Sequence, residues 1–301
     1  MNLHKDTKSF EKVISDINQT LNIAHGLIEK DYFVTMFLER LTKKLPTMIF
    51  KGGTSLSKCY HVIKRFSEDI DITVERTQKL TQGQYRKIKQ AIVDSASELE
   101  LEILNLENTR SRQDFNQYKI DYPTMFERIG IKQYLFAETS VSVRSFPTEM
   151  KAIKSIIQEF LEERGQHDVA EQFGLHEFLV RTQKLDRTLI DKLFALGDYY
   201  LVNKTPKHSR HVYDIYKLLP IVAIDDAFRA LVKEVREARK VSNICRSAHD
   251  GADMQKLLEE IVEKDAYKND YVEMESILMY EPVPYSEAKK ALIKIINKNI
   301  F

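Results

Sequence analysis

The stretch from Lys51 to Val74 constrains this chain most, because it joins a pair of glycines to a pair of acids: K-G-G-T-S-L-S-K-C-Y-H-V-I-K-R-F-S-E-D-I-D-I-T-V. Successive side chains of a β-strand point to opposite faces, so a strand here places Asp69 and Asp71 side by side and turns the alternate apolar residues toward a core. Neighbouring carboxylates repel each other. A divalent cation removes that repulsion, and Mg²⁺ prefers one or two carboxylates together with substrate phosphates. The sequence therefore predicts that Asp69 and Asp71 bind Mg²⁺.

The paired glycines before the acids suit a phosphate group. Gly52 and Gly53 allow the backbone to approach a ligand closely. The next amides, at Thr54 and Ser55, would open a helix, and helix N-termini attract anions. We therefore predict that these four residues bind the triphosphate of a nucleotide, and that the whole stretch performs nucleotidyl transfer. The alternative is an ordinary glycine turn before a core strand whose acids are solvated.

The motif G-G-[ST]-x followed by D-x-D resembles the signature of the DNA polymerase β-like nucleotidyltransferase superfamily. The longer string K-G-G-T-S-L…R-F-S-E-D-I-D resembles one branch of it, the AbiEii/AbiGii-type nucleotidyltransferase toxins of bacterial toxin–antitoxin and phage-defence (abortive infection) systems. The resemblance implies an enzyme that moves a nucleoside monophosphate from an NTP to an acceptor hydroxyl at a tRNA end and releases pyrophosphate. It also implies a cognate antitoxin as a partner.

The composition fits a soluble globular protein of 301 residues, with 43% hydrophobic and 30% charged residues. The net charge is +1, so an RNA partner would have to bind a local basic patch. No apolar stretch has the length of a signal peptide or of a membrane span, which predicts a cytoplasmic protein without a membrane partner. The two cysteines, Cys59 and Cys245, are far apart and predict neither a zinc site nor a disulfide.

Hydrophobic periodicity predicts an α+β chain with two lobes. Residues 1–184 form the nucleotidyltransferase lobe, a polymerase β-like unit with a mixed sheet, and residues 185–301 form an all-helical lobe that closes the active-site cleft. The strands expected in the first lobe are 48–50, 69–74, 115–122, 134–143 and 177–182. The helices expected there are 9–22, 27–45, 84–104 and 149–163, with a further helix through residue 170. The helices expected in the second lobe are 187–202, 209–219, 226–241, 254–264, 268–279 and 286–297.

A third acid is expected beside the pair, because polymerase β-like enzymes take one from a neighbouring strand. Glu138 lies on the more polar face of the strand 134–143 and matches that place in the toxin pattern, which implies that it completes the metal site. Asp121, on the preceding strand, is the rival candidate. Glu138 could instead be an ordinary exposed strand acid.

Three residues of the helical lobe extend the predicted site. Lys192 lies close to the apolar stripe of its helix, where it would either snorkel to solvent or reach the cleft. Arg210 and Asp214 stand four residues apart, as in a surface ion pair. The strings R-T-L-I-D-K-L-F-A-L and R-H-V-Y-D-I-Y, beginning at residues 187 and 210, resemble family motifs. The resemblance implies that Lys192 and Asp214 act in catalysis or nucleotide binding, with Arg210 as a partner for phosphate or for Asp214.

The mechanism expected from these residues is metal-assisted nucleotidyl transfer. Asp69 and Asp71 would hold two Mg²⁺ ions, with Glu138 as the candidate third ligand. Lys192 would add positive charge against the departing triphosphate. Asp214 would either orient Lys192 and Arg210 or help to deprotonate the acceptor. The alternatives are transfer to a protein side chain and an inert nucleotide-binding defence protein, and no residue is predicted to read the base.

Overall fold

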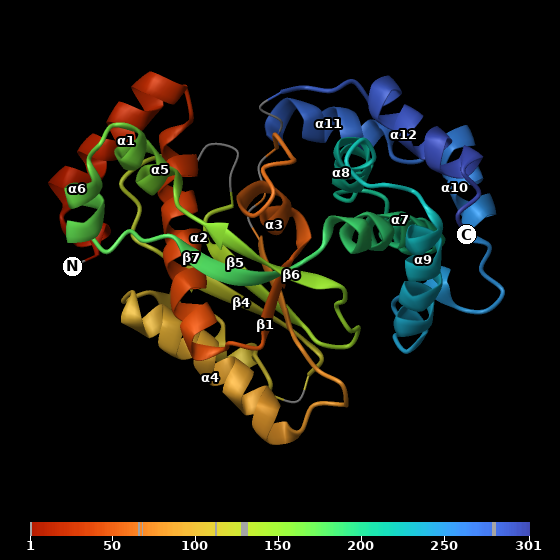
Figure 1. Ribbon diagram of the computed structural model, residues 1–301, viewed down its shortest axis with the longest axis horizontal. Coiled ribbons are helices and arrows are strands. Elements are labelled where there is room, and N and C mark those ends of the chain that lie inside the picture. Colours follow the sequence, from red (N-terminus) through yellow and green to blue (C-terminus); the bar gives the residue numbers. More distant parts are fainter. Residues whose placement is uncertain (1, 66, 68, 112, 128–131, 279–280) are drawn as a thin grey trace. The chain divides into compact units, whose positions relative to one another are not determined.

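The computed structural model describes residues 2–65, 67, 69–111, 113–127, 132–278 and 281–301 (Figure 1). Phe66 and Glu68 of the R-F-S-E string, and Met279 at the end of one expected helix, lie outside the described residues. No helix among the described residues is long and apolar enough to cross a membrane.

The strands of the described residues join into one seven-stranded sheet with the order β3-β4-β5-β2-β1-β7-β6. β1 pairs with β7 and β2 with β5 in parallel, whereas β4 pairs with β3 and with β5 in an antiparallel way. The mixed sheet that the sequence predicts is therefore confirmed. The bounds are β1 (Met48–Lys51), β2 (Asp69–Val74), β3 (Glu102–Ile103), β4 (Phe115–Asp121), β5 (Leu135–Ser140), β6 (Thr148–Ile153) and β7 (Phe178–Gln183).

The described residues divide into two compact units. The first unit comprises Met1–Phe50, Glu68–Val141 and Met150–Thr182, and the second comprises Lys51–Ser67, Ser142–Glu149 and Gln183–Phe301. The glycine turn thus packs with the helical part of the chain, whereas the acid pair packs with the sheet. The predicted division into functional lobes at residue 184 stays a prediction.

The first unit buries one face of its central strands under helices. Ile70 and Ile72 of β2 and Ala137 of β5 are buried, as the period-two pattern predicts. Helix α2 is almost entirely buried and contacts α1, α4 and α5. Helix α4 begins at a capping box formed by Thr81 and Gln84. The helices of this unit are α1 (Thr7–Leu21), α2 (His25–Lys44), α4 (Gln82–Glu98), α5 (Ile156–Glu163) and α6 (His167–Gln172).

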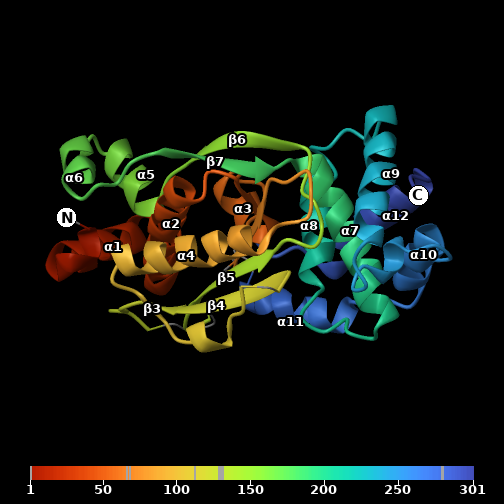
Figure 2. The ribbon, with the colours of Figure 1, turned by 90° about the horizontal axis from the view of Figure 1, so that it is seen from below.

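The second unit is built around helix α7, which contacts α8, α9 and α10 (Figure 2). Leu189, Leu193 and Phe194 of α7 are fully buried. Helix α12 contacts both α8 and α10 and completes the same hydrophobic core. The helices of this unit are α3 (Gly52–Lys58), α7 (Leu185–Leu201), α8 (Arg210–Leu218), α9 (Asp226–Lys240), α10 (Met254–Glu263), α11 (Lys268–Leu278) and α12 (Tyr285–Asn297).

Two predicted helices are wrong in part. The helix expected over 84–104 ends at Glu98, because Glu100 takes a left-handed conformation (φ 57°) and Ile103 pairs with Ile120 in β3. The helix expected over 149–163 begins only at Ile156, because Thr148–Ile153 forms β6 beside β7 and Ser155 caps the following helix. In both cases pairing with a distant strand decides the backbone conformation, and local periodicity does not contain that information.

A glycine of α7 tests the packing of the second unit. A Cβ at Gly197 would stand 2.9 Å from both Met254 Sδ and Ser247 Cβ. We expect Gly197→Ala to lower the free energy of unfolding by about 1–3 kcal/mol, because overpacking exceeds the gain in helix propensity. Gly83→Ala is the matched control, since the nearest atom there is 3.9 Å away, and it should leave stability unchanged or slightly raised. Urea denaturation of the two variants measures both effects, and an equal response would contradict the packing described here.

Candidate active site

The predicted acids of the first unit stand on one face of paired strands. In the parallel register of β2 and β5, Asp71 is the direct partner of Glu138, and Asp69 is the partner of Phe136. Cross-strand partners share a face, and neighbouring strands lie about 4.8 Å apart. On the other side of β5, Gln117 of β4 is the partner of Glu138, and its Nε2 donates a hydrogen bond to Glu138 Oε1 at 2.7 Å. We call Asp69, Asp71 and Glu138 the acid row.

The register separates the two candidates for the third acid. Glu138 stands opposite Asp71 on the next strand. Asp121 lies on β4 four residues beyond Gln117, which is about 13 Å along the strand, and its partner is Glu102 of β3. The structure therefore brings Glu138, and not Asp121, next to the predicted metal ligands. The role of Glu138 as a ligand stays a prediction.

A lysine that sequence reasoning missed pairs with the acid row. Lys132 donates from Nζ to both carboxylate oxygens of Asp69, at 2.6 and 2.8 Å, and its ammonium lies 5.1 Å from the centre of the Phe136 ring. Asp69 is buried, with 8% of its surface exposed. Lys132 precedes β5 in an irregular segment, so no periodic pattern marks it in the sequence. The Asp69 carboxylate is therefore ion-paired with a side-chain ammonium in this fold.

The acid row has the donor chemistry that Mg²⁺ requires. Among the residues that the structure describes, no three His, Cys, Asp or Glu side chains gather closely enough to hold a metal by themselves. Mg²⁺ does not need such a cage, because one or two carboxylates suffice when substrate phosphates and water complete its octahedron. Asp69 and Asp71, with Glu138 opposite, fit that requirement.

The glycine turn lies in the second unit, and a larger residue would be strained at Gly52 and crowded at Gly53. Gly52 has a φ of 76°, a left-handed conformation that favours glycine. A Cβ at Gly53 would stand 2.5 Å from Ser67 Oγ and 2.8 Å from Arg65 Nη2. The side chains of Thr54 and Ser55 are buried, and they donate to Ser67 Oγ and to the Gly52 carbonyl oxygen, respectively. Contact with a phosphate would therefore use the backbone of this turn rather than these two hydroxyl groups.

Three charged side chains meet inside the second unit, and we call them the buried charge cluster. Arg65 donates from Nε and Nη2 to the two oxygens of Asp214, each at 2.7 Å. Lys192 donates from Nζ to Asp214 Oδ2 at 2.6 Å. The exposed fractions of Arg65, Asp214 and Lys192 are 2%, 0% and 6%. The structure thus brings together the two predicted residues Lys192 and Asp214, and it adds Arg65.

Electrostatics in the cluster hold Asp214 ionised. Burial alone would raise the pKa of Asp214, but the charges of Arg65 and Lys192 outweigh it and place that pKa below its ordinary value. Burial lowers the pKa of Lys192, and the charge of Arg65 acts in the same direction, against the attraction of Asp214. A carboxylate whose oxygens already accept three charged hydrogen bonds is a poor proton acceptor. The geometry therefore favours the orienting role for Asp214 over the deprotonating role.

Asp214 has an arginine partner that the sequence did not predict, and the role predicted for Arg210 stays a prediction. The two-pronged partner of Asp214 is Arg65, which lies 149 residues away in sequence. Arg210, one turn before Asp214 on α8, adds positive charge that lowers the pKa of Lys192. Arg65 belongs to the R-F-S-E string, so the resemblance marked its neighbourhood, but nothing in the sequence showed which carboxylate it binds.

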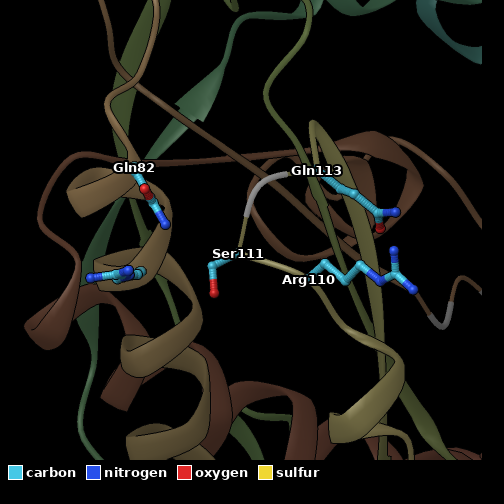
Figure 3. Close-up of a pocket in the computed structure, with 5 residues that line it drawn as sticks. Gln82, Arg110, Ser111 and Gln113 are labelled. Carbon is cyan, nitrogen blue, oxygen red and sulfur yellow. The ribbon is translucent and has the colours of Figure 1, made fainter.

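A separate pocket of about 450 Å³ in the first unit contains none of the predicted site residues. It lies between the start of α4, which supplies Gln82, and the segment before β4, which supplies Ser111 (Figure 3). Two arginines, Arg86 and Arg110, and Gln113 complete its lining. This pocket therefore belongs neither to the acid row nor to the buried charge cluster.

Comparisons with known proteins find one matching family and a similar solved structure. It matches the family described as "Nucleotidyl transferase AbiEii toxin, Type IV TA system" over residues 37–292, a range that includes every predicted site residue. No curated protein matches the chain. Among solved structures it is similar to MenT4, a nucleotidyltransferase toxin from Mycobacterium tuberculosis H37Rv, with a TM-score of 0.53 and 14% identity, covering 95% of this chain and 88% of that one. This structural likeness shows a shared fold.

The contact between Lys132 and Asp69 predicts competition with a metal. In Lys132→Met the carboxylate loses its ammonium partner, so we expect added Mg²⁺ to raise Tm by about 2–4 °C more than in the unmodified protein. Lys119→Met is the control, because Lys119 lies over the Tyr134 ring on the neighbouring strand, with its Nζ 3.8 Å from the ring centre. Thermal unfolding with and without Mg²⁺ measures the difference. An equal rise in Tm on adding Mg²⁺ in all three proteins would show that Lys132 does not compete with a metal for Asp69.

Proposed function

Because the chain belongs to the AbiEii family of nucleotidyltransferase toxins of type IV toxin–antitoxin systems, we propose that it transfers a nucleoside monophosphate from an NTP to a tRNA end. The family accounts for the nucleotidyltransferase activity, for the NTP and for an antitoxin as partner. The tRNA acceptor, a dependence on Mg²⁺, a cytoplasmic location and a part in phage defence are our proposals. They follow the resemblance of the K-G-G-T-S-L and D-I-D strings.

The observation that carries the proposal is the acid row. Asp71 and Glu138 are cross-strand partners and Asp69 shares their face, so three carboxylates line one surface of the sheet. We assign the binding of Mg²⁺ to these residues. When bound there, Mg²⁺ supplies a lowered pKa for the acceptor hydroxyl and neutralises charge on the leaving pyrophosphate. Lys132, which now pairs with Asp69, would release that carboxylate when the metal binds.

The second unit contributes the positive charges in this proposal. Backbone amides of the turn at Gly52 and Gly53 bind phosphate oxygens, because a glycine backbone can approach a ligand closely. Lys192 stabilises the negative charge that grows on the triphosphate, an effect that is larger in a water-excluded site than in bulk solvent. Asp214 holds the Lys192 ammonium in place. Arg210 supplies a further charge for phosphate.

A variant of the acid row tests the assignment. We expect Asp71→Ala to lower nucleotide transfer by about 100-fold or more, because it removes one of the carboxylates to which we assign Mg²⁺ binding. The fold should be unchanged or slightly more stable, since one of two neighbouring like charges is removed. Asp121→Ala is the matched control, because it removes the other strand acid and should keep transfer near the level of the unmodified protein. Circular dichroism and label incorporation are measured on the same preparations, and normal transfer by Asp71→Ala would refute the metal assignment.

The acceptor is tested by the product that becomes labelled. The protein is incubated with each α-labelled NTP, Mg²⁺ and total cellular RNA or total protein, and we expect the label to appear in tRNA-sized RNA. Label in protein would overturn the proposed acceptor and keep the enzyme. If neither the RNA nor the protein fraction carries more label than the Asp71→Ala blank, the proposed transfer to both acceptor classes is contradicted.

A further inference from the structure

The guanidinium of Arg65 touches two parts of the second unit at once. Nε and Nη2 bind the two oxygens of Asp214, and the same Nη2 lies 2.8 Å from the position of a Cβ on Gly53. Only 2% of Arg65 is exposed, so solvent does not share these contacts. One rigid, planar group therefore lies between the glycine turn and the carboxylate.

A backbone contact fixes the same two segments a second time. The amide of Lys64 donates a hydrogen bond to the Tyr213 hydroxyl at 3.0 Å. Lys64 precedes Arg65 and Tyr213 precedes Asp214, so the two hydrogen-bonded pairs are adjacent along both segments. The segment that carries Arg65 is thereby tied to α8 at consecutive residues.

The position of Lys192 depends on this arrangement. Its ammonium donates to Asp214 Oδ2, the oxygen that also accepts from Arg65 Nη2. A carboxylate held by a two-pronged arginine cannot rotate without breaking two charged hydrogen bonds. Arg65 therefore determines where Asp214 presents Oδ2, and Asp214 determines where Lys192 places its charge.

We propose that Arg65 is a positioning residue, which acts through Asp214 to hold the Lys192 ammonium at a set place relative to the glycine turn. This inference rests on the proposed nucleotidyl transfer, because Lys192 acts there on the triphosphate. It assigns to Arg65 no contact with substrate. Arg65 supplies two things, the geometry of its fork and one positive charge, and two variants separate them.

The charge of Arg65 also bears on the protonation of Lys192. The charged groups with the largest effects on the Lys192 ammonium are Asp214, Arg65 and Arg210, and His211 lies close enough for Lys192 to act on it. Burial, with the positive charge of Lys192, holds the pKa of His211 well below its ordinary value, so this ring is neutral near pH 7. Removing the positive charge of Arg65 removes a repulsion on the Lys192 ammonium and leaves the attraction of Asp214, which raises the pKa of Lys192.

The experiment compares Arg65→Lys with Arg65→Gln. Arg65→Lys keeps the charge and loses the fork, so we expect kcat to fall about 10- to 100-fold with KM for NTP little changed and the basic limb of the pH–kcat profile unmoved. Arg65→Gln loses the charge as well, so the basic limb should move to higher pH. Arg239→Lys is the control, because Arg239 is also buried and binds two carboxylates, Asp191 and Asp198. It should lose stability without a change in kcat or in the pH profile of the folded protein.

A second set of substitutions perturbs the Arg65 guanidinium through the glycine turn. In Gly53→Ala with Ser67→Ala, the serine oxygen that lies 2.5 Å from the new Cβ is gone, and the contact with Arg65 Nη2 at 2.8 Å remains. We expect kcat to fall without a shift of the basic limb. The loss should be smaller in the Arg65→Lys background, because the displaced nitrogen is already absent there. This arm keeps the test valid if Arg65→Gln does not fold.

Three results would overturn the inference. The first is a kcat for folded Arg65→Lys equal to that of the unmodified protein, and the second is an unmoved basic limb in Arg65→Gln. The third is that the effects on kcat of Arg65→Lys and of Gly53→Ala with Ser67→Ala simply add. If the unmodified protein transfers no label, the proposed function fails separately. The arrangement is then tested by NMR titration of lysines labelled at the ε-carbon, with the signal assigned by Lys192→Met. A higher Lys192 pKa in Arg65→Gln than in Arg65→Lys supports the positioning role, and equal values overturn it.

Discussion

The carboxylate of Asp214 accepts hydrogen bonds from two cations in the interior of the second unit. Burying an ion costs several kcal/mol, and the cost is recovered only where the geometry of the pair is good and the remaining lone pairs are satisfied. Two cations share this one carboxylate, so all three charged groups depend on the same local geometry.

The acid row presents the complementary problem in the first unit. Its carboxylates repel one another, and the protein offsets this with a lysine on Asp69 and an amide on Glu138. Neither group is part of the D-I-D motif. The acid row thus places carboxylates close together on the strands, and the buried charge cluster places two cations close together in the helical part.

Much of the fold follows from local patterns. The alternation in 134–143 predicted which side chains of β5 are buried, because a strand has a fixed period of two. In β2 the apolar residues are buried as predicted, but Asp69 and Thr73 on the other face are buried as well. The amphipathic helices around α7 follow equally from their apolar spacing. β6 and the end of α4 did not follow, because T-E-M-K-A-I and the residues around Glu100 take their conformation from strands that are distant in sequence.

The candidate site divides in the same way. The sequence by itself determined the residue types and their order: the glycine turn, the paired acids, and the lysine and aspartate of the helical part, since each belongs to a short motif with a local geometry. Only the tertiary structure decided the partners: Glu138 rather than Asp121 opposite Asp71, Lys132 on Asp69, and Arg65 on Asp214. The physical reason is that strand register and buried ion pairs join residues up to 149 positions apart. Their energies depend on distance and desolvation in the folded chain, and no local pattern in the sequence encodes these quantities.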